Sequence, residues 1–259
     1  MKKKVILILI DGMGSQGFQA CTHPYAKKMT QMGWYNPRSQ VVLPSQTLPC
    51  HMSLFHSVDP TRHGITSNIY TPMARPLPGL FEQLKAAKKT SAMFYGWEQL
   101  RDVARPGVMT YASFFHYAQA PDSDQILTRQ ALERIRESKP DFVFLYLAST
   151  DDRGHKFGWM TPEYHQCVYD AISSVEQVVN AVLEEYTVIV TADHGGHDRS
   201  HGTDDPRDLY VPVFLFGEDL APGTAFESSI LDIAPTIADI MGIAPAEEWD
   251  GHSILKEVP

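Results

Sequence analysis

The stretch VILILIDG, residues 5–12, points most directly to the fold class of this chain. Its first six residues are apolar and mostly β-branched, which is typical of a parallel strand buried on both faces. Four similar runs follow, and helical patterns with apolar residues every three to four positions lie between the runs. This alternation predicts a doubly wound, mostly parallel α/β sheet with helices on both faces. The strands are expected at 5–10, 91–95, 142–147, 188–191 and 213–216, and the helices at 80–88, 125–138, 163–185 and 230–241.

Length and composition favour a single domain. The chain has 259 residues, of which 43% are hydrophobic, and this is enough to bury a full core. Single α/β domains routinely reach ~250 residues, so the length does not require a second domain. We therefore expect one domain over residues 1–259 with a small cap at most. The stretch from about 70 to 115, with its prolines and aromatic residues, is the candidate for that cap.

The net charge and the cysteine content limit which classes of partner and which cellular compartment we expect for this protein. A formal net charge of −9 argues against binding of a nucleic acid polymer, and a small anionic substrate would need a local positive centre such as bound metal. The three cysteines have no C-x-x-C spacing, so we expect a reducing, cytoplasmic location. The apolar run at 5–10 is too short for a signal peptide, and no stretch approaches the ~20 apolar residues of a membrane span.

Carboxylates and imidazoles follow the ends of several expected strands. Asp11 comes directly after the first run, and Asp193 follows the run at 188–191. Asp151 lies four residues after the run at 142–147. Ligands of open parallel sheets bind outside the carboxyl ends of the strands. We therefore expect these side chains to converge on one edge of the sheet.

The spacing of these residues suits metal binding. Asp151 and His155 lie four residues apart, His194 follows Asp193, and His201 comes seven residues after His194. Asp and neutral His are the ligands that zinc, and to a lesser degree manganese, prefers when thiolates are absent. One such residue alone is more often a helix cap or an ordinary surface or core residue. Their joint occurrence favours metal ions, because clustered carboxylates repel each other without a cation.

Taken together, the motifs resemble a known family. LIDG at 9–12, TLPCH at 47–51, DDRGH at 151–155, TADHG at 191–195 and HG at 201–202 resemble the nucleotide pyrophosphatase/phosphodiesterase branch of the alkaline phosphatase superfamily, in the family's order. The resemblance extends to DGHSIL at 250–255 and covers nearly the whole chain. The family usually has Thr-Phe-Pro-Asn-His at the nucleophile, whereas this chain has Leu48 and Cys50. This departure, and the limited room for a nucleoside pocket, leave the substrate preference open.

The resemblance implies an alkaline phosphatase-like fold with two divalent ions, usually zinc. It implies Thr47 as the nucleophile and Asn68, 21 residues further on, as a donor to a phosphate oxygen. Ordinary loop chemistry is the alternative for Asn68, and His197 is the alternative to His201. The implied ligands are Asp151, His155 and His201 for one ion, and Asp11, Asp193, His194 and the Thr47 oxygen for the other.

Thr47 needs activation, because a threonine hydroxyl is a poor nucleophile. Coordination to a divalent ion would lower the pKa of this hydroxyl. Residues 48–57 are expected to form a helix with Pro49 in its first turn, whose free N–H groups would face a phosphate. Thr47 would also cap this helix, and a capping role alone is the alternative.

The resemblance implies a phosphodiesterase or nucleotide pyrophosphatase that acts on a small phosphate ester through a phosphothreonine intermediate. A phosphomonoesterase or a phosphonate hydrolase on the same metal core is an open alternative, as is a non-catalytic binding protein on this scaffold. A sulfatase is disfavoured, because its motif Cys/Ser-x-Pro-x-Arg has the convertible residue where this chain has Thr47 and the arginine where this chain has His51. The oligomeric state stays open.

Overall fold

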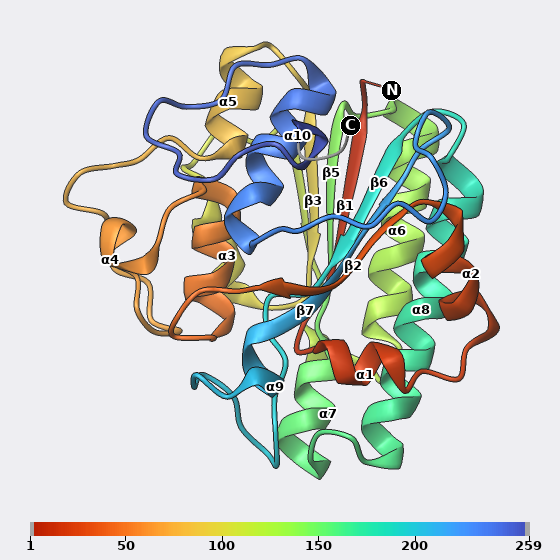
Figure 1. Ribbon diagram of the computed structural model, residues 1–259. Helices are drawn as coiled ribbons and strands as arrows, with labels where there is room; N and C mark the ends of the chain where they lie inside the picture. The colour runs from red at the N-terminus through yellow and green to blue at the C-terminus, as the bar shows by residue number, and fades with distance from the viewer. Residues whose placement is uncertain (1–2, 257–259) are drawn as a thin grey trace.

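A seven-stranded sheet forms the centre of the computed structural model, which describes residues 3–256 (Figure 1). The strand order is β2-β7-β6-β1-β5-β3-β4. Strand β7 runs antiparallel to both of its neighbours, and every other pairing is parallel. The predicted mostly parallel α/β fold is therefore confirmed. The strands are β1 Val5–Ile10, β2 Trp34–Gln40, β3 Ser91–Tyr95, β4 Tyr111–Phe114, β5 Phe142–Leu147, β6 Thr187–Thr191 and β7 Tyr210–Phe216.

Strand β1 occupies the middle of the sheet. Val5 lies opposite Phe142 of β5 on one side and opposite Thr187 of β6 on the other. All six residues of β1 are fully buried, as expected for a strand covered on both faces. All five predicted strands are present, and β6 and β7 begin earlier than expected. The sequence patterns missed β2 and β4, which are the edge strands: β4 alternates between half-buried and exposed residues, and β2 contains Pro37.

Helices cover both faces of the sheet. Figure 1 shows α6 and α8 on one face and α3, α5 and α10 on the other. The predicted helix at 230–241 begins with a short 3₁₀ turn, and the α-helix itself starts at Ile233. The α-helices are α1 Ser15–Gln19, α2 Pro24–Met32, α3 Thr47–His56, α4 Pro60–His63, α5 Leu80–Ala86, α6 Ser123–Ser138, α7 Ser149–Phe157, α8 Pro162–Val182, α9 Pro206–Leu209 and α10 Ile233–Met241, and the 3₁₀ helices are η1 Glu98–Val103, η2 Tyr117–Gln119, η3 Ile230–Asp232 and η4 Ile254–Lys256.

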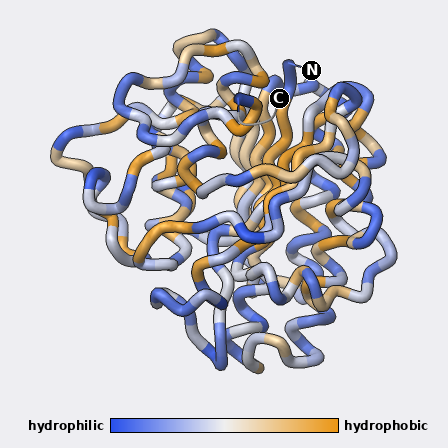
Figure 2. The backbone as a smooth tube through the Cα atoms, viewed as in Figure 1, coloured by the Kyte–Doolittle hydropathy of each residue, from blue (hydrophilic) through white to orange (hydrophobic). Residues whose placement is uncertain are grey.

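The hydrophobic core follows the sheet. Figure 2 shows the central strands as hydrophobic and the outer helix faces and loops as largely hydrophilic. Buried aromatic side chains such as Phe144, Phe55 and Phe81 fill the layer between the sheet and the helices α3 and α5. Among the described helices, none is both long and apolar enough to cross a membrane.

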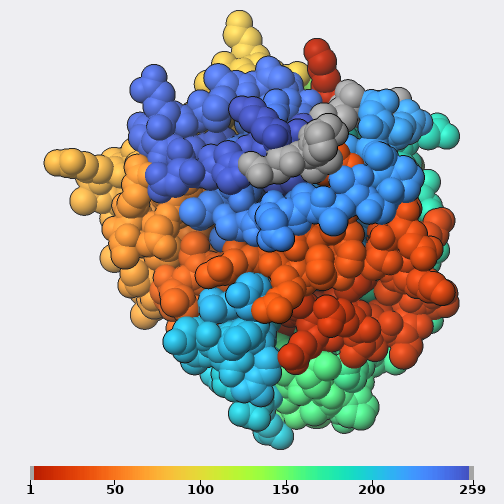
Figure 3. All heavy atoms as spheres, in the orientation of Figure 1, coloured from red at the N-terminus to blue at the C-terminus, as the bar shows by residue number. Residues whose placement is uncertain are grey.

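The carboxyl ends of the parallel strands meet at one edge of the molecule. The backbone N–H of Asp11 after β1 donates to the carbonyl of Leu147 at the end of β5, at 2.9 Å, so the two strands end at the same level. Helix α7 begins there, and Figure 3 shows the segment around 195–210 beside α7 at the lower side of the visible face. Segments distant in the sequence therefore share this edge.

Candidate metal centre

A first group of ligand side chains lies at the ends of β1 and β6. It consists of Asp11, Asp193 and His194, whose ligand atoms lie within 4.8 Å of one another. The Nε2 atom of His194 is 3.3 Å from Oδ1 of Asp11 and 3.5 Å from Oδ2 of Asp193. All three residues are buried. We call them the buried group.

Backbone groups hold the buried group in place. The Oδ1 atom of Asp193 accepts from the N–H of Gly12 at 3.2 Å and from the N–H of His194 at 3.0 Å. The Nδ1 atom of His194 lies 2.8 Å from the carbonyl oxygen of Gly195. A carbonyl only accepts, so Nδ1 carries the proton and the lone pair of Nε2 faces the two carboxylates. Gly12 has φ +68°, and a Cβ there would lie 3.1 Å from Asp151, so this turn favours glycine.

A second group of ligand side chains lies on α7 and on the loop after β6. It consists of Asp151, His155 and His201, again with ligand atoms within 4.8 Å of one another. The Nδ1 atom of His155 donates to the carbonyl of Arg199 at 3.0 Å, and that of His201 donates to the carbonyl of Ser45 at 2.8 Å. Both Nε2 atoms are therefore available toward Asp151. We call this set the open group, because the side chain of His155 is 46% exposed.

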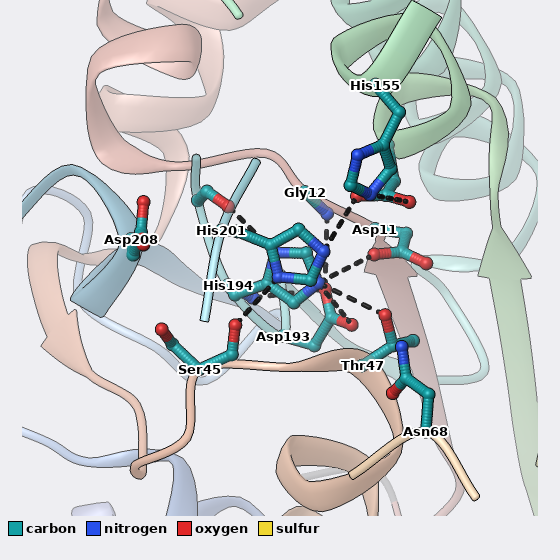
Figure 4. A network of polar contacts seen from close by, with 12 residues as sticks. Asp11, Gly12, Ser45, Thr47, Asn68, His155, Asp193, His194, His201 and Asp208 are labelled. Carbon is teal, nitrogen blue, oxygen red and sulfur yellow. Dashed lines mark hydrogen bonds and ion pairs between the residues drawn. The ribbon is translucent and has the colours of Figure 1, made fainter. Parts of the chain in front are cut away.

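The two groups adjoin each other. The rings of His194 and His201 stack with centroids 3.7 Å apart and planes 8° from parallel. Figure 4 shows Asp11 to the right of this stack, Asp193 and Thr47 to its lower right, and His155 to its upper right. The structure thus brings the six predicted Asp and His residues together in the same two sets of three.

His197 belongs to neither group. Its Nδ1 atom lies 2.7 Å from Oδ1 of Asp208, which is fully buried. The other oxygen of Asp208 accepts from the N–H of Thr203 at 3.0 Å and from its hydroxyl at 2.7 Å. Asp208 thus braces the loop that carries His194 and His201. The sequence patterns gave no signal for Asp208, because its partners are set by the path of this loop.

Burial controls the electrostatics of both groups. It lowers the pKa of His194 to about 3 and that of His201 to about 4, so both imidazoles are neutral near pH 7. Burial also raises the pKa of Asp11 and of Asp193, and the repulsion between neighbouring carboxylates raises them further. Without a cation the folded site therefore favours protonated carboxyl groups, because the neutral histidines do not compensate negative charge there.

The donor set fits divalent cations. Asp11 Oδ1, Asp193 Oδ2 and Asp151 Oδ1 are buried oxygens without a hydrogen-bond partner. Leaving such groups unsatisfied is costly, and native proteins normally avoid it. Here the oxygens share their space with the Nε2 atoms of neutral histidines, which is the chemistry that zinc and manganese require. The residues present therefore fit two metal ions.

Thr47 is the first residue of α3 and lies against the buried group. Its Oγ1 atom is 3.2 Å from Nε2 of His194. The prediction that Thr47 caps α3 is wrong, because the N-cap residue is Gln46 and no side chain caps the helix there. The Thr47 side chain instead points to the site, which the backbone geometry of a first-turn residue permits (Figure 4).

Asn68 lies beside Thr47, and its side chain occupies one of the backbone N–H groups at the start of α3. Its Oδ1 atom accepts from the backbone N–H of Leu48 at 2.9 Å. Pro49 has no N–H, and the N–H of Cys50 donates to Gln46 within the helix. The prediction that free N–H groups of this turn face a phosphate is therefore wrong for these residues. The amide nitrogen of Asn68 lies on the side of Thr47 (Figure 4).

A cavity of about 250 Å³ opens over Thr47, the open group and Asp11 of the buried group. None of its lining residues in the described part of the chain is a lysine or an arginine. Trp97 lies within the expected cap stretch, whereas Tyr117, Tyr146 and Asp152 were not singled out by the sequence patterns. The lining residues are Asp11, Thr47, Asn68, Trp97, Tyr117, Tyr146, Ala148, Asp151, Asp152, His155 and His201.

Comparison with solved structures supports the fold. Murine ectonucleotide pyrophosphatase/phosphodiesterase 5, solved as an inactive threonine-to-alanine variant in complex with AMP, superposes with a TM-score of 0.79. The match covers 93% of this chain and 96% of that chain at 13% identity, a level at which it shows the fold alone.

Curated relatives match over a shorter region. The 2,3-bisphosphoglycerate-independent phosphoglycerate mutase of Flavobacterium psychrophilum is 35% identical over 136 residues, which cover 50% of this chain and 26% of the mutase. The phosphopentomutase of Desulfitobacterium hafniense is 30% identical over 146 residues, which cover 55% of this chain and 36% of that enzyme. The chain therefore spans well under half the length of these relatives.

A family model gives the broadest sequence match. The model for type I phosphodiesterase/nucleotide pyrophosphatase matches residues 5–208, a range that contains both ligand groups, Thr47 and Asn68. This range includes most of the chain and agrees with the motif resemblance and with the structural match. The chain belongs to the type I phosphodiesterase/nucleotide pyrophosphatase family.

Proposed function

We propose that this protein is a two-metal phosphoesterase that hydrolyses small phosphodiesters or nucleotide pyrophosphates through a phosphothreonine intermediate on Thr47. The observation that carries the proposal is the position of the Thr47 hydroxyl, 3.2 Å from Nε2 of His194 and in the cavity that Asp11 and the whole open group also line. Family membership supports the reaction class. The threonine-to-alanine variant of the murine relative is described as inactive, which agrees with a nucleophilic threonine.

The two ligand groups would each hold one divalent ion, zinc in the first place and manganese as the alternative. Asp11, Asp193 and His194, together with the Thr47 oxygen, would hold one ion, and Asp151, His155 and His201 the other. When bound, such a pair supplies the positive charge that attracts the phosphate and stabilises the attacking and leaving oxygens.

The first turn of α3 fixes the position of the Thr47 hydroxyl. The carbonyl oxygen of Thr47 accepts from Nδ1 of the buried His51 at 2.7 Å, which fixes this turn of the helix. Thr47 gives up its hydroxyl proton to solvent, a bond forms between its Oγ1 and phosphorus, and the bond from phosphorus to the leaving oxygen breaks, so that this oxygen departs with the electron pair and takes up a proton from solvent as needed. In the second step water adds to phosphorus, the bond from phosphorus to Oγ1 breaks, and Thr47 regains a proton. The hydrogen bond from the N–H of Leu48 to Oδ1 of Asn68 orients the Asn68 side chain. Its amide nitrogen then donates to a non-bridging phosphate oxygen.

The charge of the cavity favours a diester over a monoester. A phosphate monoester carries up to one more negative charge than a diester, and among the described lining residues no cationic side chain meets it. The carboxylate of Asp152 lines the same cavity and would repel this extra charge. Trp97 and Tyr117 instead offer aromatic surface to the second ester group. A phosphonate monoester is also a monoanion, so the same observation keeps phosphonate hydrolysis as the second candidate.

The nucleophile is tested with Thr47→Ala. We expect hydrolysis of bis(p-nitrophenyl) phosphate to fall by at least about 10³-fold, because the covalent step is lost. The variant should still bind ions through the six Asp and His ligands, which metal analysis would show. Thr61→Ala is the matched control, since Thr61 is an exposed threonine near the start of α4. Near-native hydrolysis by Thr47→Ala would overturn the assignment of the nucleophile.

The reaction class is tested with the wild-type protein. We expect faster turnover of bis(p-nitrophenyl) phosphate than of p-nitrophenyl phosphate at equal concentration. Faster turnover of the monoester would contradict the diester preference. No bound ion and no turnover of either substrate in zinc-replete protein would favour a non-catalytic binding protein on this scaffold.

A further inference from the structure

Helix α7 begins without a capping side chain of its own. This helix carries Asp151 and His155 of the open group, and its N-cap residue is Ala148, which makes no side-chain cap bond. The first N–H groups of a helix have no partner within the helix. At a buried helix start these donors need an acceptor from elsewhere in the molecule.

Asp124 provides this acceptor from a different helix. It lies in the first turn of α6, and its side chain is almost fully buried. Its Oδ1 atom accepts from the N–H of Ala148 at 3.0 Å, and its Oδ2 atom accepts from the N–H of Ser149 at 3.1 Å. The carboxylate therefore binds two successive amides at the positive end of α7, which is the favourable end for an anion.

We propose that Asp124 is a positioning residue for the open group. Two bonds to successive amides fix both the start of α7 and its rotation about the axis, and this sets the direction in which Asp151 points. The far end of α7 is positioned separately: Gly154 packs against the ring of Trp159, and His155 bonds to the carbonyl of Arg199. Only the first turn depends on Asp124.

The buried group has no such dependence. Asp11, Asp193 and His194 come after the ends of β1 and β6. Backbone groups of Gly12, His194 and Gly195 bond to the side chains of Asp193 and His194. Loss of Asp124 should therefore weaken metal binding at the open group and leave the buried group intact. This inference rests on the proposed function, because it assumes that both groups bind metal.

The experiment measures zinc binding to the metal-stripped full-length protein by calorimetry and by metal analysis after dialysis. The wild type should bind two zinc ions, and Asp151→Asn should keep one. Asp124→Ala should weaken the same site that Asp151→Asn abolishes, so that zinc affinity at the open group falls about 10- to 100-fold, as is usual when outer support of a ligand is removed. Asp124→Asn keeps the shape of the side chain and one acceptor oxygen, so it should fold and show a smaller loss.

Asp141→Ala is the matched control. Asp141 precedes β5, at the opposite end of the strand that leads into α7, and its Oδ2 atom accepts two hydrogen bonds from Thr90. The control loses a similar pair of bonds, but it should bind two zinc ions with wild-type affinity. Hydrogen exchange at residues 148–152 should rise in both Asp124 variants and stay unchanged in Asp141→Ala.

The outcomes separate this inference from the proposed function. Two ions with wild-type affinity in Asp124→Ala and Asp124→Asn would overturn the positioning role while leaving the two-metal function intact. Equal weakening of both sites, in these variants or in the control, would reduce Asp124 to a general stability residue and would also overturn it. If the wild type itself binds no zinc, the proposed two-metal function fails first.

Discussion

The buried group and the open group use the same ligand chemistry but are supported differently. Side chains of the buried group follow two central strands, and their backbone partners lie within two residues of a ligand. The open group combines one short helix with one loop, and it depends on Asp124, Ser45 and Arg199 from other parts of the chain. Strand ends and the hydroxyl of Tyr146 on β5, which donates to Oδ2 of Asp11, thus position one half of the site, while the other half needs contacts from outside the sheet.

The difference in burial has an energetic consequence. His194 is fully buried, whereas the His155 side chain is 46% exposed, so water screens charge at the open group more effectively. Uncompensated carboxylates in the buried group destabilise the metal-free fold more than those in the open group. We therefore expect the unfolding free energy of the metal-free protein to depend more on the charges of the buried group than on those of the open group.

The largest expected effect comes from replacing an anionic ligand of the buried group. Asp193→Asn should lower diester hydrolysis by at least about 10³-fold, because an anionic ligand is lost. The same change should raise the melting temperature of the metal-free protein at pH 8, since it removes a desolvated carboxylate while the amide oxygen can still accept from Gly12 and His194. Activity assays and differential scanning calorimetry after chelation measure both effects.

Asp151→Asn is the matched variant in the open group. It should also impair hydrolysis, but it should stabilise the metal-free protein less, because Asp151 is more exposed than Asp193. Equal stabilisation by the two variants would contradict the energetic difference between the groups.

A smaller effect concerns the pH dependence of the metal-free fold. Burial raises the pKa of Asp124 from 3.8 to about 6, with a contribution from the nearby Asp170 carboxylate. The folded state therefore favours the protonated form, and the resulting stabilisation is present below pH 4 and is lost as the pH rises through about 6. For one group this amounts to at most about 3 kcal/mol. Asp124→Asn should show a correspondingly smaller loss of stability between pH 4 and pH 8.

Urea unfolding of the chelated wild type and of Asp124→Asn at both pH values measures this difference. Asp141→Asn is the control, because the hydrogen bonds from Thr90 hold the pKa of Asp141 below its usual range against the opposing effect of burial. Its contribution has the opposite sign, being lost as the pH falls. Identical pH profiles for the wild type and Asp124→Asn would contradict the raised pKa.

The smallest expected effect tests the cavity wall beside the open group. Asp152→Asn should raise kcat/KM for p-nitrophenyl phosphate, relative to the diester, about three- to tenfold, because one repulsive charge is removed from a partly exposed site. Asp102→Asn is the charge-matched control, since Asp102 lines a neighbouring pocket and not this cavity. An unchanged ratio in Asp152→Asn would show that Asp152 does not select against the monoester.

Much of this fold could be predicted because its central strands are buried on both faces. The runs at 5–10, 91–95 and 142–147 coincide with β1, β3 and β5. The edge strands β2 and β4 could not be found in this way, because one face or edge meets solvent and the apolar pattern breaks. The local sequence was also misleading at Thr47. A threonine before a helical pattern predicts a helix cap, but the side chain of Thr47 turns to His194 instead.

The amino-acid sequence by itself determined the five inner strands, because buried apolar runs are local features, and the resemblance of its motifs to a known family implied the two sets of ligand side chains. Only the tertiary structure decided how these ligands are supported. By sequence, Asp124 is an ordinary acidic residue in the first turn of α6, and Asp208 belongs to a polar loop. Their carboxylates bond instead to α7 and to the histidine loop, because packing brings those amides and hydroxyls within reach after the chain has folded.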